Sequence, residues 1–142
     1  MADDLKATVR RVIEEIYGAG SLDAADEIFA ADFVGHDPAL PEPLRGPAGL
    51  KEAAAGYRAA FPDLRVTVNE QVGEGDVVAT RWTATGTQHG ELFGIAPTGK
   101  QATVSGVTID RFADDRIVES WVNWDALGLL QQLGAIPAPA TA

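Results

Sequence analysis

The sequence predicts an α+β fold with its helices before most of its strands. Apolar residues recur at helical spacing in the chain up to Phe61, whereas from Leu64 onward they alternate with polar residues, as they do in half-buried strands. No internal repeat and no linker-like stretch separates the two parts. We therefore expect a single domain over residues 1–134, followed by a frayed tail over residues 135–142.

Three helices are expected before the strands. The first carries an apolar stripe that ends before Gly18, and it consists of Leu5, Val9, Val12, Ile13 and Ile16. The second is short, with Ser21 as its N-cap and with Leu22, Ala25, Ile28 and Phe29 on its apolar face. The third opens at Gly46 and Pro47 and is closed by Pro62.

Several strands and a last helix follow. Residues 32–38 predict a short strand or extended turn, and alternation predicts strands over residues 64–69, 77–85, 101–112 and 117–124. The glycine-rich stretch 86–100 is expected to be a loop. Asp125 is placed as the N-cap of a final helix that Gly134 ends. Most of these strands are joined by short turns, which predicts a mostly antiparallel sheet.

Composition excludes several classes of function. The 142-residue chain has no Cys, so it has no disulfides, thiolate metal ligands or Cys nucleophile. With only two His, a zinc site would need carboxylates for most of its ligands, which is uncommon. We therefore expect neither a metal nor a cofactor. A net charge of −10 with scattered basic residues argues against nucleic acid as a partner. No apolar run is long enough to cross a membrane, and we expect a cytoplasmic protein.

The last two strands have a register that can be read from their charges. If Asp115 lies near the left-handed region of the turn, Arg111 faces Glu119, and an opposite-charge pair supports that register. The same register pairs Asp110 with Ser120. One face of this hairpin then carries Val104, Gly106, Thr108, Asp110, Phe112, Val118, Ser120, Val122 and Trp124. The other face carries Val107, Ile109, Ile117 and Trp121 around the Arg111–Glu119 pair.

Both faces of the hairpin are apolar, and each needs cover. The second face has no helix left to cover it, so we expect a homodimer formed through sheet faces; the alternative is a twisted sheet that covers its own second face. The first face mixes bulky apolar groups with Asp110, Thr108 and Ser120, which is typical of a pocket for a small apolar organic molecule. The alternative is that Asp110 lies at a solvent-exposed rim of the pocket or only forms a hydrogen bond with Ser120.

Several motifs together resemble one known family. They are the loop GTQHGELFGIAPTGK, the later DDRIVESW, Asp125, LLQQLG, the early FVGHDP, and AAFPDL at the end of the third helix. In this order they are similar to the SnoaL-like polyketide cyclases, also called ester cyclases, along nearly the whole chain. The resemblance implies a cone-shaped α+β barrel of the nuclear-transport-factor type, with helices packed on a strongly curved sheet, a dimer, and a ligand inside the cone.

The resemblance also implies a chemistry. The characterised cyclases close a ring by a cofactor-independent aldol reaction in which a pocket Asp takes a substrate proton. At the matching positions this chain has Val122 in place of that Asp and Thr108 in place of its His companion. The histidine of the loop motif is Gln88 here, followed by His89.

The candidate catalytic residues are therefore Asp110 and His36. Histidine is a common acid/base residue at physiological pH, and His36 lies in GHDP, which could stand at the mouth of the cone. Glu119 is interpreted as the partner of Arg111, Asp125 as a helix cap, and His89 as an exposed loop residue. The expected substrate-binding residues are Tyr57, Arg81, Trp82, Thr108, Ser120, Val122 and Trp124.

The expected function is a cofactor-independent cyclase or isomerase that acts on a polyketide or similar apolar metabolite, with Asp110 or His36 transferring protons. Two alternatives stay open. One is an epoxide hydrolase, for which Arg81 and Asp110 would supply two members of an Asp-Arg-Asp set. The other is a binding protein that holds a small molecule without turnover.

Overall fold

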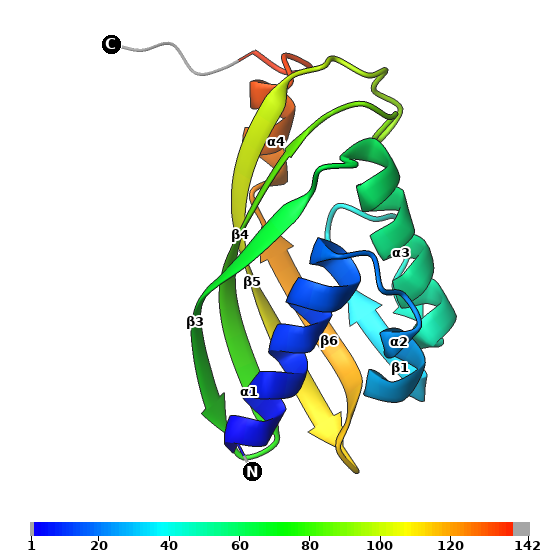
Figure 1. Cartoon of the computed structure of the whole chain (residues 1–142), viewed down its shortest axis with the longest axis vertical. Helices are drawn as coiled ribbons and strands as arrows, with labels where there is room; N and C mark the ends of the chain where they lie inside the picture. Colours follow the sequence, from blue (N-terminus) through cyan, green and yellow to red (C-terminus); the bar gives the residue numbers. More distant parts are fainter. Residues whose placement is uncertain (1, 138–142) are drawn as a thin grey trace.

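The computed structural model describes residues 2–137, and its helices precede most of its strands (Figure 1). The helices are α1 (Ala2–Arg11), the π-helix η1 (Val12–Gly18), α2 (Ala24–Ile28), α3 (Gly46–Ala60) and α4 (Ala126–Gln132). The strands are β1 (Phe29–His36), β2 (Leu44–Arg45), β3 (Arg65–Glu74), β4 (Val77–Thr87), β5 (Gln101–Ala113) and β6 (Arg116–Trp124). The predicted α+β class is confirmed.

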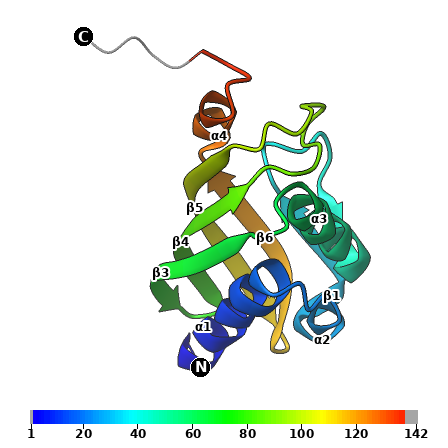
Figure 2. The same cartoon turned by 45° about the horizontal axis from the view of Figure 1, so that its top comes forward.

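The strands form one six-stranded sheet in the order β2-β1-β6-β5-β4-β3. All neighbours are antiparallel except β1 and β6, which run parallel. The sheet is strongly curved, and Figure 2 shows β3, β4, β5 and β6 wrapping around the helices. Because β2 and β3 are free edges, the sheet is not closed, so the predicted barrel is an open cone.

The first helix is continuous with a wider π-helical turn. Its second half, η1, buries Val12, Ile13 and Ile16, as the apolar stripe predicted. Arg58 of α3 donates to the main-chain oxygens of Tyr17 at 2.8 Å and Gly18 at 2.9 Å, which satisfies carbonyls left free at the helix end. The predicted cap at Ser21 is wrong, because α2 begins at Ala24 and its N-cap position is Asp23.

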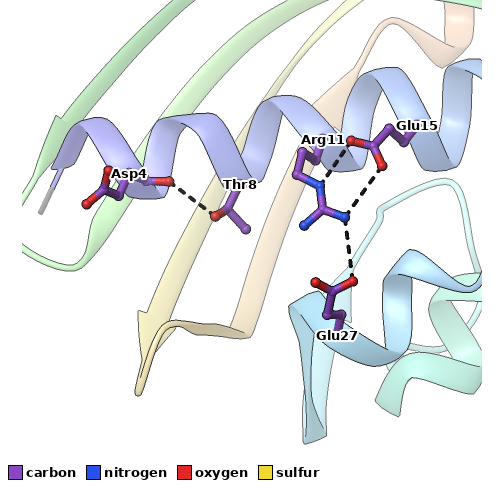
Figure 3. A network of polar contacts seen from close by, with 5 residues as sticks. All are labelled: Asp4, Thr8, Arg11, Glu15 and Glu27. Carbon is purple, nitrogen blue, oxygen red and sulfur yellow. Dashed lines mark hydrogen bonds and ion pairs between the residues drawn. The ribbon is translucent and has the colours of Figure 1, made fainter.

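A surface network joins this first helix to α2. Arg11 bonds Glu15 one turn along at 3.0 Å and lies 3.6 Å from Glu27 of α2 (Figure 3). Nearby, the Thr8 hydroxyl donates to the Asp4 carbonyl at 3.1 Å. Exposed ion pairs of this kind contribute at most about 1 kcal/mol each, so the network orients the two helices more than it stabilises them.

The predicted register of the last hairpin is confirmed, with one local correction. Arg111 pairs with Glu119 and Asp110 with Ser120, as expected. The turn has positive φ at both Asp114 and Asp115, and the register shifts between Arg111 and Phe112, which leaves Val118 as the extra residue of a bulge on β6. The bulge moves Ile117 to the inner face, where it is fully buried, in place of the predicted Val118.

The outer face of the sheet carries no helix in the views of Figures 1 and 2. Val107 and Ile109 on this face are 42% and 40% exposed in the single chain. The helices α1, α2 and α3 instead lie on the concave side (Figure 2). The fold therefore has an inner face covered by helices and an outer face on which Val107 and Ile109 are exposed among charged residues.

The C-terminal part follows the prediction closely. Asp125 caps α4 by accepting from the Gly128 amide at 2.8 Å, and Gly134 has the positive φ expected after a helix. The amides of Ala135 and Ile136 bond the Leu130 carbonyl, so the start of the predicted frayed tail is held on the helix. Residues 138–142 of that tail lie outside the described residues. Within residues 2–137, no helix is both long and apolar enough to span a bilayer.

Candidate functional site

An internal cavity of about 180 Å³ lies between the concave face of the sheet and the helices. Val9, Ile13 and Phe33 of one apolar cluster line it, and so do Phe61 and Leu129 of a second cluster around α4. Most of its wall is apolar, and of the described residues neither Lys nor Arg lines it. Such a cavity suits a small neutral organic molecule.

Asp110 is the most buried acidic group in this wall. Its side chain enters the cavity from β5, is 4% exposed, and accepts a hydrogen bond from the Ser120 hydroxyl of β6. Burial raises the pKa of Asp110 to about 7, although the Ser120 bond opposes that shift. At neutral pH the carboxyl is therefore held near the midpoint of its titration, where it can both give and take a proton.

Two tryptophans stand in the same wall because a glycine leaves room for them. Gly106 lies between Trp82 on β4 and Trp124 on β6, and a Cβ added there would meet Trp82 at 2.5 Å and Trp124 at 2.8 Å. The Trp82 indole nitrogen donates to the Thr108 hydroxyl at 2.9 Å. This bond satisfies the indole N–H, so the Trp82 ring can lie in the apolar wall of the cavity.

A second carboxylate, which the sequence reasoning missed, lines the cavity. Asp37 follows β1 and accepts hydrogen bonds from the Tyr57 hydroxyl at 3.0 Å, the Trp124 indole at 3.0 Å and the Ala39 amide at 2.9 Å. A signal for it existed, since strand alternation places Asp37 on the same face as the buried Phe33.

Two tyrosines complete the polar part of the wall. Tyr57 was predicted, whereas Tyr17 from η1 was not. Burial, then the charges of Asp37 and Asp110, raises the pKa of Tyr17; burial, then Asp37, raises that of Tyr57. Both phenols therefore stay protonated and can act as hydrogen-bond donors.

A second hollow, of about 770 Å³, adjoins the cavity at Tyr57. Leu44, Ala53 and Tyr57 line both spaces, and Phe93 from the glycine-rich loop lines the outer one. The Phe93 ring packs against Tyr57 and Trp124, with centroids 6.3 Å and 6.4 Å away. The three aromatic rings therefore lie together where the two spaces meet.

Comparison with known proteins shows which family the chain belongs to. A model described as SnoaL-like polyketide cyclase matches residues 7–133. The chain belongs to this family. A search of curated proteins found no match.

Solved structures of similar proteins agree with this membership. IdmH from Streptomyces antibioticus, a candidate polyketide cyclase, is 34% identical with a TM-score of 0.78, over 92% of this chain and 98% of that one. AclR from Streptomyces galilaeus, a candidate hydroxylase, is 28% identical with a TM-score of 0.86, over 99% and 87%. A Catenulispora acidiphila protein with a ketosteroid isomerase-like fold, 21% identical with a TM-score of 0.76 over 95% and 97%, supports the fold alone.

Most wall residues predicted for this SnoaL-like chain do lie in the cavity. The structure brings together Tyr57, Trp82, Thr108, Asp110, Ser120, Val122 and Trp124. Val122 and Thr108 occupy the positions that the resemblance matched to the acid/base pair of characterised family members. The acidic groups at this cavity are instead Asp110 and Asp37.

His36 differs from its predicted role. It borders the cavity, but its Nε2 bonds Glu119 at 2.8 Å and its ring stacks on Trp121 with centroids 5.7 Å apart. Glu119 also bonds Arg111 at 2.6 Å on the outer face. Because β1 runs parallel to β6 with Gly35 beside Ser120, His36 points away from the cavity.

Arg81 lies outside the cavity. Its side chain is exposed on β4 and forms an ion pair with Glu70 at 3.3 Å, because the neighbouring Trp82 takes the inward position. The geometry therefore places Arg81 and Asp110 on opposite faces of the sheet. An epoxide hydrolase that uses both residues does not fit.

Gln88 has a structural role in the SnoaL-like loop. Its side chain is fully buried and bonds the carbonyls of Gly90 and Ile95, both at 3.1 Å, and the amide and hydroxyl of Thr98 at 3.1 and 2.8 Å. His89 next to it is exposed, as predicted. Among residues 2–137 no cluster of three potential metal-binding side chains is found.

Proposed function

We propose that this protein is a cofactor-independent cyclase or isomerase in which Asp110 transfers a proton to or from a neutral carbonyl compound held in the cavity. Family membership supports a cyclase-type enzyme. The observation that carries the proposal is a buried carboxyl with a pKa of about 7 in an apolar cavity. A neutral carboxyl there can donate to a substrate carbonyl oxygen, which makes the adjacent C–H bond more acidic.

The charge of the wall supports a neutral substrate. Asp37 and Asp110 are the acidic groups at the cavity, and no Lys or Arg among the described residues offsets them there. An anionic substrate would be repelled, whereas an apolar ketone or ester meets aromatic walls and hydrogen-bond donors. The adjoining hollow gives room for a substrate longer than the inner cavity.

The proposal is tested by deuterium exchange into 2-tetralone, a neutral bicyclic ketone, in D₂O by NMR. The wild type is expected to accelerate exchange beside the carbonyl, and Asp110→Asn to lower that rate about 100-fold, because the amide cannot release a proton. Asp32→Asn, which changes an exposed acid, should not lower the rate. Wild-type exchange at the buffer rate with saturable binding of 2-tetralone would instead support a binding protein.

A further inference from the structure

The cavity holds two carboxyl groups in unlike surroundings, and only one of them has a role in the mechanism above. Asp110 comes from the middle of β5 and has Ser120 as its one hydrogen-bond partner. Asp37 comes from the loop after β1 and has three donors. Acid/base reactions on carbon need a group that takes the proton as well as one that polarises the carbonyl.

The hydrogen bonds that the described residues give to Asp37 leave one acceptor position of its carboxylate without a donor. A carboxylate accepts about four hydrogen bonds, two at each oxygen. The Trp124 indole and the Ala39 amide occupy Oδ1, and the Tyr57 hydroxyl occupies one position at Oδ2. No second donor to Oδ2 is found among residues 2–137, and Asp37 lines the cavity. The three donors hold the carboxylate in one orientation, as a catalytic base requires.

The other polar side chains of the inner wall are less suited to removing a proton. Burial raises the pKa values of Tyr17 and Tyr57, so both phenols remain protonated donors. The His36 ring is bonded to Glu119 on the outer face. The hydroxyl of Thr108 accepts from Trp82, and the hydroxyl of Ser120 donates to Asp110.

We propose that Asp37 is the general base of this site and that it removes a proton from the carbon beside the substrate carbonyl. This inference rests on the proposed function, and it adds a second catalytic residue on a different element. Tyr57 and the Trp124 indole are then positioning groups that hold the base. The substrate class that follows is a neutral carbonyl compound with an acidic C–H bond.

The proton and electron balance is complete without any co-reactant. The proton passes from the substrate carbon to Oδ2 of Asp37, and the C–H electron pair forms a C=C bond while the carbonyl π pair moves to oxygen. The neutral Asp110 carboxyl gives its proton to that oxygen and takes it back when the carbonyl re-forms. In an isomerase, Asp37 returns the proton to another carbon of the substrate. In a cyclase, the nucleophilic carbon attacks a second carbonyl of the same molecule, and the new alkoxide takes the proton.

The experiment measures 2-tetralone exchange in Asp37→Asn together with binding of 2-naphthol, which has the shape of the enol. We expect exchange to fall at least 100-fold while the Kd for 2-naphthol changes less than threefold, because the amide keeps the size of the side chain. In Asp37→Ala, added formate should restore exchange in a saturable way, since a small carboxylate can occupy the vacated position. A residue that only supports the fold would show no such rescue.

The matched control is Asp63→Asn. Asp63 also holds hydrogen bonds, from the Thr87 amide at 2.7 Å and its hydroxyl at 2.8 Å, but it is exposed and outside the cavity. This variant should exchange at the wild-type rate. The inference is overturned if Asp37→Asn stays within threefold of wild type while Asp110→Asn is impaired. It is also overturned if exchange and 2-naphthol binding fall in proportion and formate restores neither.

Discussion

Replacing Asp110 with Asn is expected to change how the stability of the fold depends on pH. Burial raises the pKa of Asp110 from 3.8 to about 7, so the folded protein keeps a proton at this site over a range in which the unfolded chain has lost it. Ionisation then favours the unfolded chain. The contribution of Asp110 to the free energy of unfolding therefore falls by about 1.4 kcal/mol per pH unit between the two pKa values, and it levels off above about pH 7.

The size of the effect follows from those two values. Because the two pKa values differ by about 3, ionisation at position 110 lowers the free energy of unfolding by about 4 kcal/mol at pH 8. At pH 5 it lowers the free energy of unfolding by less than about 2 kcal/mol. Asn at position 110 has no charge to bury and can still accept from Ser120. The free energy of unfolding of Asp110→Asn, compared with that of the wild type, should therefore rise by about 2.5 kcal/mol between pH 5 and pH 8.

Urea denaturation of both proteins at four pH values from 5 to 8 measures this gain. Burying an amide changes the stability of the variant by the same amount at every pH. This constant cancels, because the test compares how the free-energy difference between variant and wild type changes with pH. Asp32→Asn, at an exposed position, provides the control and should show no such trend. A difference between Asp110→Asn and wild type that is the same at pH 5 and pH 8 would refute the burial argument.

Three further predictions concern structure outside the cavity. We propose that a second copy covers the outer face, so Trp121→Glu should convert a dimer to monomer or aggregate in sedimentation velocity, and an unchanged dimer would contradict this. Asp125→Ala should lower the free energy of unfolding, measured in urea, by about 1 kcal/mol because the helix cap is lost, whereas Asp125→Asn should stay near wild type. If Asp125→Asn loses exchange activity with unaltered melting, the residue is catalytic. Gln88→Leu should lower stability by about 2 kcal/mol or more, because it leaves buried loop groups unpaired, and an unchanged urea midpoint would exclude that role.

Local signals were sufficient for most elements. The apolar stripe of the first helix, the cap at Asp125 and the opposite charges of Arg111 and Glu119 each act between near neighbours in the chain. They led to the right helices, the right hairpin register and the inward placement of Asp110. This works because helical and strand periods and turn chemistry depend on a few consecutive residues.

Non-local pairing decided the parts that the sequence reasoning missed. Strand alternation puts His36 and Asp37 on opposite faces, but the partners that each side chain meets, Glu119 for His36 and Trp124 for Asp37, are brought there by the contact between β1 and β6 and are distant in sequence. A bulge exchanged the places of Ile117 and Val118, because one extra residue reverses the faces of a strand.

By itself, the sequence determined the α+β class, the family resemblance and several polar and aromatic residues of the cavity wall, since these follow from periodicity and motifs. The tertiary structure alone decided that the sheet stays open, that Arg81 faces solvent, and that Asp37 is held by Tyr57 and Trp124. The physical reason is that burial, desolvation and the number of donors at a carboxylate depend on which distant elements come together around it.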